Sequence, residues 1–293
     1  MRIIKEYTLR KITVILVGLF ILFIFNLVPT KSSLKIHGKE NYVYLLDDDN
    51  YLSKVICYFD TASLEDEIYK RIELLTNKNS MNKFHSLIPS STKLNSIRID
   101  KNDVYLDFSK ELLTSTNEEK MIESIVYTLS EINGIENIYI NVEGKELRFL
   151  PNIKKEIPYP LNRSYGINKE YYLTSFDDID ETTIFFIKNC NDLKYLVPVT
   201  KITNTNEEKI NIIINELKSK YNINKDVFLL NHYIDNNIMY LIFNDYIFND
   251  SGILDDIKDV LKNSIFENYD VNKIIIMNEK NTIKIEINKW LDF

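Results

Sequence analysis

The stretch VYLDFS at residues 104–109 decides the fold, because part of it recurs later in the chain. Its Tyr-Leu pair at 105–106 returns at 240–241, and the alternating IYI at 138–140 matches III at 274–276. The two separations differ by a single position, so the offset between the matching segments is nearly constant. A nearly constant offset across two separate elements is typical of a duplicated unit. The sequence therefore predicts two copies of one fold in a chain of 293 residues.

Both copies repeat the same order of apolar patterns, namely hairpin, helix, hairpin, helix and hairpin. In the first copy the predicted strands are 42–46, 54–59, 94–99, 104–108, 135–142 and 146–150, with helices beginning near Ser63 and Asn117. In the second copy they are 183–187, 194–202, 227–233, 238–243, 271–277 and 283–287, with helices beginning near Asn206 and Ser251. Hairpins pair antiparallel and the helices cross over, which favours the α+β class. We expect two tandem small mixed-sheet domains, each a sheet covered on one face by two helices.

A proline-rich stretch, PNIKKEIPYP at residues 151–160, separates the copies and holds three of the six prolines in the chain. Proline lacks an amide donor and restricts the residue before it, so neither a helix nor a central strand continues here. We therefore expect a first domain at 40–150, a proline-containing linker at 151–167 and a second domain at 168–293. Such a linker is semi-rigid.

The N-terminal segment differs from the rest of the chain. Residues 12–28 contain no charge, and as a helix they would be about 25 Å long, which is enough to cross the hydrocarbon core. The preceding residues 1–11 carry four basic side chains and one acidic one, which predicts a cytoplasmic N-terminus. A cleaved signal peptide would need small residues at its cleavage site, whereas residues 26–31 read NLVPTK. We expect an uncleaved transmembrane signal anchor at 12–29, in a single-pass cell-membrane protein with an extracytoplasmic body.

Composition and motifs argue against catalysis. The formal charge of −7 disfavours nucleic-acid binding, which needs a clustered basic face. Only six glycines occur, and no GxSxG, HExxH or P-loop pattern is present. The histidines His37, His85 and His232 are scattered and favour structural roles. We therefore expect no catalytic residue, no cofactor and no bound metal.

The acidic clusters and the cysteines leave two further questions. Asp47–Asp49, Asp177–Glu181 and Asp255–Asp256 lack the alternating ligands, central glycine and terminal glutamate of a calcium loop, so we interpret them as solvated turns or helix starts. Cys57 and Cys190 fall at non-equivalent places in the two copies. A disulfide between the copies and two free thiols both remain open at this point.

One block carries a resemblance to a known family. Residues 104–145 join a strand end, a helix with a T-L-x-x-φ-x-G-φ segment and a strand ending in G-K. Its motif residues are Asp107, Ser109, Thr128, Leu129, Gly134 and Gly144. This block resembles the GerMN domain of the GerM family of sporulation and spore-germination proteins. The second copy reads LIFN at residues 241–244 and lacks both glycines, so its resemblance rests on the duplication.

The resemblance implies properties that the residue patterns do not show. It implies domains similar to ring-building motifs, in tandem, and a non-catalytic role in an envelope complex between mother cell and forespore. Extracytoplasmic sporulation channel or ring proteins would then be the partners, and the motif residues would be structural. Family members are usually anchored through a lipid on a cysteine, whereas this chain has the predicted signal anchor. The alternative is an envelope protein that binds or processes cell-wall glycan, with peptidoglycan as its partner.

Overall fold

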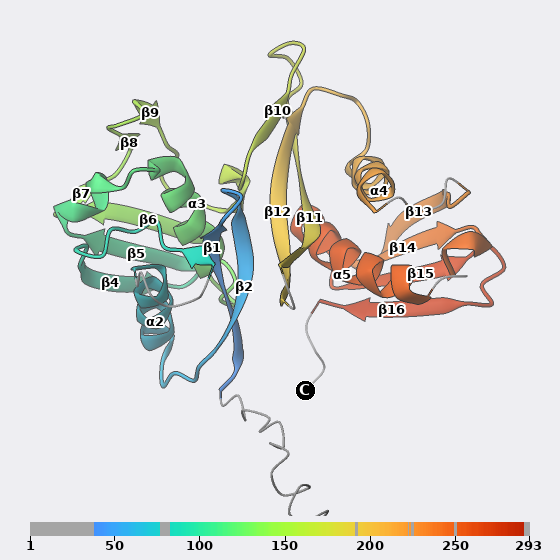
Figure 1. Cartoon of the computed structure of the whole chain (residues 1–293), viewed down its shortest axis with the longest axis horizontal. Helices are drawn as coiled ribbons and strands as arrows, with labels where there is room; N and C mark the ends of the chain where they lie inside the picture. Colours follow the sequence, from blue (N-terminus) through green and yellow to red (C-terminus); the bar gives the residue numbers. More distant parts are fainter. Residues whose placement is uncertain are drawn as a thin grey trace, which may run out of the picture. The chain divides into compact units, whose positions relative to one another are not determined.

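The computed structural model describes residues 38–76, 83–190, 193–221, 223, 226–248 and 251–289 (Figure 1). Residues Lys39–Phe293 form one compact unit. The predicted cytoplasmic segment 1–11, the predicted anchor 12–29 and His37 lie outside the described residues. Within the described ranges, no helix has the length and apolar character needed to span a bilayer.

The first copy contains the elements that the sequence predicts, together with a short strand, β3, that it does not predict. They are β1 Glu40–Asp47, β2 Leu52–Tyr58, α2 Leu64–Thr76, β3 Phe84–His85, β4 Leu94–Asp100, β5 Asp103–Phe108, α3 Glu118–Leu129, β6 Asn137–Val142 and β7 Lys145–Glu146. The amide of Asp66 donates to the Ser63 hydroxyl, and the amide of Lys120 donates to the Asn117 side chain, which fixes the starts of α2 and α3. Acidic residues in the first turn of both helices match the helix dipole.

The second copy repeats this order with a longer first hairpin, but it begins with an additional strand, β10, and its described residues contain no counterpart of β3. Its elements are β10 Glu170–Tyr172, β11 Asp180–Cys190, β12 Leu193–Thr203, α4 Lys209–Lys220, β13 Leu229–Asp235, β14 Ile238–Phe243, α5 Ser251–Asn268, β15 Lys273–Asn278 and β16 Lys284–Asn288. Short 3₁₀ helices at Lys110–Thr114 and Asp245–Phe248 follow β5 and β14, so even this minor element is duplicated.

Each copy has its own four-stranded sheet, in the orders β4-β5-β6-β7 and β13-β14-β15-β16. The two central strands run parallel in both sheets, because a helix crosses over between them. Tyr105 lies opposite Tyr139 in the first sheet, and Tyr240 lies opposite Ile275 in the second. The same offsets that relate the repeated sequence segments relate these two pairs, so the predicted duplication holds at the level of strand register.

The expectation of two separate sheets is wrong for the first hairpin of each copy. The β1–β2 and β11–β12 hairpins leave their own four-stranded sheets and meet each other, where Lys54 of β2 lies opposite Leu196 of β12 (Figure 1). They form one six-stranded sheet together with β3 and β10. The alternation of side chains predicts a strand but not its partner, which is why the sequence pattern did not reveal this shared sheet.

The predicted linker is part of the packed body. It contributes β9 Lys155–Glu156, which pairs with β8 Phe149–Leu150 at the end of the predicted first domain, and a 3₁₀ helix at Arg163–Tyr165. Four of its apolar side chains join the core of the first copy: Ile157, Leu161, Tyr165 and Ile167. Leu161 also pairs with Ile138 of β6 through two backbone hydrogen bonds of 2.8 and 2.9 Å. Residues 151–167 therefore extend the first copy and do not form a spacer, because apolar side chains alternate with the prolines.

Candidate functional site

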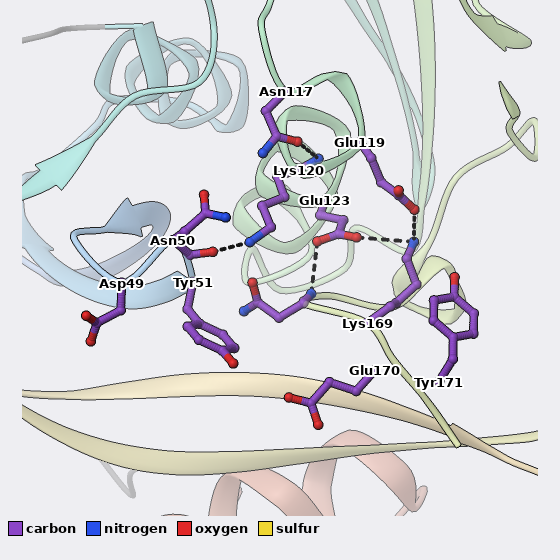
Figure 2. Close-up of a pocket in the computed structure, with 11 residues that line it drawn as sticks. Asp49, Asn50, Tyr51, Asn117, Glu119, Lys120, Glu123, Lys169, Glu170 and Tyr171 are labelled. Atoms are coloured by element: carbon purple, nitrogen blue, oxygen red, sulfur yellow. Dashed lines mark hydrogen bonds and ion pairs between the residues drawn. The ribbon is translucent and has the colours of Figure 1, made fainter. Parts of the chain in front are cut away.

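A polar pocket of about 370 Å³ lies where three segments of the chain meet (Figure 2). Its walls come from the turn between β1 and β2, the first two turns of α3 and the start of β10. The lining residues are Asp49, Asn50, Tyr51, Asn117, Glu119, Lys120, Glu123, Asn168, Lys169, Glu170 and Tyr171. Because 168–171 belongs to the second copy and the other residues to the first, the pocket exists only when both copies are folded together.

The β1–β2 turn is held by Asp47, which is buried. One oxygen of its carboxylate accepts hydrogen bonds from the amides of Asp49 at 3.0 Å and Tyr51 at 2.8 Å. Burial alone would raise the pKa of Asp47, but these bonds and the ammonium of Lys188 lower it. Asn50 has a φ of 66°, which asparagine tolerates in a tight turn. This acidic cluster therefore closes a turn, as the sequence predicts, but its first carboxylate is buried and not solvated.

Lys169 bridges the two glutamates of the pocket. Its ammonium lies 3.0 Å from Glu119 and 3.2 Å from Glu123. Burial raises the pKa of Glu123, whose side chain is 2% exposed, although Lys169 and the Asn168 amide oppose the shift. Burial also acts on Glu119, but hydrogen bonds from Lys155 and Lys169 outweigh it and lower the pKa.

Two carboxylates with pKa values moved apart are the usual pattern of an acid and a base in catalysis. Here the same ammonium occupies the space between Glu119 and Glu123. The other oxygen of Glu123 accepts from the Asn168 amide at 2.9 Å. Both glutamates are therefore held in ion pairs with Lys169. The pocket instead offers paired charges and two tyrosine side chains, Tyr51 and Tyr171, which suits recognition of a polar partner.

Asn168 joins the two copies directly beneath the pocket. Its side-chain oxygen accepts from the Leu52 amide, and its side-chain nitrogen donates to the carbonyls of Leu52 and Pro198, all at 2.8 Å. Proline has no amide hydrogen, so β12 cannot form a regular ladder with β2 at Pro198. The asparagine side chain supplies the missing hydrogen bonds between the two hairpins.

Arg163 makes a second connection between the copies. Its guanidinium contacts Glu131 at 2.8 Å and also contacts Glu267. The offset between the copies relates these two glutamates, so they occupy equivalent positions. Burial alone would raise the pKa of Glu131, but the charges of Lys54 and Arg163 outweigh it and lower the pKa to about 2. We call Arg163, Glu131 and Glu267 the arginine clamp.

The motif residues of the first copy all take part in the fold. Asp107 accepts from the Gly144 amide at 2.7 Å, and Ser109 accepts from the Lys93 amide at 3.0 Å. Thr128 accepts from the Tyr44 amide of β1 at 2.9 Å, beside the fully buried Leu129. Gly134 and Gly144 have φ values of 89° and 73°, which favour glycine.

The second copy keeps two of these interactions with different residues. Ser264 is the equivalent of Thr128 and accepts from the Phe185 amide of β11 at 2.9 Å. Asn244 is the equivalent of Ser109 and accepts from the Phe228 amide at 3.1 Å. The hydroxyls of Thr128 and Ser264 thus each accept a hydrogen bond from one backbone amide of the first hairpin in their own copy. The sequence motif alone did not indicate this role.

The remaining sequence candidates lie apart from the pocket. His85 contacts Asp48 and His232 contacts Glu208, each at 3.0 Å. Cys57 is a buried free thiol and forms no disulfide with any side chain that the structure describes. The side chain of Cys190 is not among the described ones. Among the residues that the structure describes, no three His, Cys, Asp or Glu side chains form a group that could hold a metal ion.

The shared sheet and the paired cores define a tandem α+β repeat protein. Residues 42–148 match the family model described as "Germane: Sporulation and spore germination". The resemblance to the GerM family, predicted from residues 104–145, is confirmed. The first copy is thus a Germane segment.

Two relatives extend this comparison over more of the chain. The chain is 28% identical over 187 residues to the spore germination protein GerM of Bacillus subtilis (strain 168), covering 60% of this chain and 50% of that protein. It thus spans about half the length of that relative. The solved tandem GerMN domains of the sporulation protein GerM from Bacillus subtilis match with a TM-score of 0.73 at 24% identity, over 87% of this chain and 98% of that structure. At this identity the structural match shows a common fold.

Proposed function

We propose that this chain is a non-catalytic envelope protein that supports the assembly of a sporulation or germination complex by binding other proteins. The proposal includes the signal anchor at 12–29, which would hold the body outside the membrane. Support comes from its similarity to a spore germination protein and to the tandem domains of a sporulation protein. The ring-building-motif-like architecture and the channel between mother cell and forespore belong to the same proposal.

One observation carries the non-catalytic part. The carboxylates of Glu119 and Glu123 are both paired with Lys169, and Glu119 is paired with Lys155 as well. General acid–base catalysis needs a group within hydrogen-bond reach of the substrate proton, with its pKa near the working pH. The ion pairs with the two lysines support a non-catalytic role for these carboxylates.

The proposal is tested by capture of the full chain from sporulating host cells after chemical crosslinking. We expect other envelope proteins to be enriched over a control strain, with crosslinks that map to this body. Capture of peptidoglycan alone, with no protein crosslinked, would contradict the proposal.

The pocket also favours a second candidate, which is recognition of cell-wall glycan. Tyr51 and the 60% exposed Tyr171 lie on two sides of a pocket lined by amides and charged groups, and sugars bind to such surfaces (Figure 2). Co-sedimentation with purified sacculi tests this candidate. A glycan site predicts that Tyr51→Ala with Tyr171→Ala abolishes sedimentation, while the exposed control Tyr69→Ala does not. Equal sedimentation of both variants, or none of the wild-type chain, would exclude it.

A further inference from the structure

Strand β13 is an end strand of the second sheet, and the first copy provides an internal reference for it (Figure 1). Its counterpart β4 is an end strand of the first sheet. Both strands carry a bulge at the same place, between Leu94 and Ser96 in β4 and between Leu229 and Asn231 in β13. The bulges obey the offset between the copies, so the two edges align residue by residue.

The aligned edges differ in the chemistry of their exposed side chains. At three equivalent positions the first copy has polar or charged residues and the second has large apolar or aromatic ones. The pairs are Lys93 and Phe228, Asn95 and Leu230, and Arg98 and Tyr233. The second-copy residues are 53%, 48% and 44% exposed, and Ile234 beside them is 51% exposed. The backbone fold does not require apolar side chains at these positions of β13, because β4 has the same backbone structure with polar residues there.

The polar residues of β4 are used within their own sheet. The Asn95 side chain donates to Asp107 at 3.2 Å, and the Arg98 guanidinium stacks over Tyr105 at 3.5 Å. Natural proteins often protect an edge strand with charged side chains in this way. In β13, Tyr233 also stacks within its own sheet, on Tyr240 with ring centroids 4.6 Å apart, but it is aromatic where β4 has a charged arginine. The exposed apolar residues lie beside a backbone edge that has no further strand in the described part of the chain.

We propose that β13 binds an extended segment of another protein as an added strand. This inference rests on the proposed function and identifies the surface that would bind the partner. Only a strand can pair with the outer amides and carbonyls of an edge, while its alternate side chains cover the apolar residues. Asp235 lies in β13, and Glu208 contacts His232 of the same strand. The partner segment therefore alternates apolar with basic residues. A second molecule of this chain is disfavoured, since each molecule carries a net charge of −7 and brings the same acidic edge.

The test places the photo-crosslinker benzoylphenylalanine in the full chain, expressed in sporulating host cells. One variant replaces Tyr233 in β13, and the matched control replaces Arg98 at the equivalent position of β4. We expect crosslinks to another protein from position 233 at least about tenfold above those from position 98, as for an anchor residue at an interface. Mass spectrometry should map them to a segment with apolar and basic residues. Crosslinks to a second molecule of this chain, or equal yields from both positions, would overturn the proposal.

A second variant gives β13 the surface of β4 through Phe228→Lys, Leu230→Asn and Tyr233→Arg. The equivalent edge already carries these side chains, so the fold should persist, and a thermal melt checks it. We expect capture of the β13 partner to fall by at least about tenfold, while the exposed control Phe176→Lys leaves it unchanged. If the triple variant captures the same proteins as the wild-type chain, β13 is not the surface, but the proposed function survives. If neither chain captures any protein, both proposals fail.

Discussion

The arginine clamp gives the most demanding prediction, for the variant Arg163→Ala. The guanidinium contacts Glu131 and Glu267, donates to the Ser130 hydroxyl at 2.9 Å and lies 4.8 Å from the ring of Tyr127. Its removal leaves the carboxylate of Glu267, whose side chain is 9% exposed, without this cation. Breaking a buried ion pair from one side costs about 3–5 kcal/mol. Because 27% of the Arg163 side chain is exposed, we expect the lower end, about 3 kcal/mol.

Urea unfolding followed by far-UV circular dichroism measures this loss. The control Arg148→Ala removes an exposed pair with Glu146 and should cost about 0–1 kcal/mol. Adding Glu267→Gln to Arg163→Ala should recover part of the stability, because no carboxylate is then left unpaired at that position. If Arg163→Ala cost no more than the control, the clamp would not hold the two copies together.

Three further predictions concern buried hydrogen bonds and charges within each copy and between the copies. Thr128→Val and Ser264→Ala each leave one edge amide without an acceptor, and each should lower the free energy of unfolding by about 1–3 kcal/mol. Asn168→Asp keeps the shape but removes two donors, and we expect a loss of about 3 kcal/mol in the same urea assay; an unchanged midpoint would show that the copies do not depend on it. The pKa of Glu131 is lowered from 4.5 to about 2 in the folded chain, so its contribution of about 3 kcal/mol is present above pH 4.5 and lost as the pH falls to 2. Glu131→Gln should flatten stability over that pH range, and an unaltered pH profile would refute the assignment.

The sequence predicted the elements of both copies because their apolar residues repeat with clear periods. In β5 and β14, Leu106 and Leu241 are fully buried at equivalent positions, as their shared pattern indicates. The offset between the copies predicted the duplication, and the strand register found in the structure obeys the same offset. Local patterns of this kind depend only on neighbouring residues, and these the sequence shows directly.

The connections between the copies could not be predicted in the same way. Arg163 lies in the proline-rich stretch that was predicted to be a linker, and Asn168 lies directly after it. Nothing in the neighbouring sequence indicates that they contact Glu131 and Leu52, which are distant along the chain. The pocket likewise combines residues from three distant segments. In the sequence, Glu119 and Glu123 are only acidic residues in the first two turns of a helix. The lysine that pairs with both, Lys169, comes from the other copy.

The claim that this chain binds without catalysis is tested most directly by sporulation frequency in host cells whose only copy carries Glu119→Gln with Glu123→Gln. The variant keeps the shape of both side chains and removes both carboxylates as acid or base. A thermal melt and partner capture establish that it is folded and assembled. The account predicts a sporulation frequency equal to that of the wild-type chain. A folded, partner-bound variant that sediments with sacculi like the wild-type chain but fails to sporulate would contradict it, because lost binding would then not explain the defect.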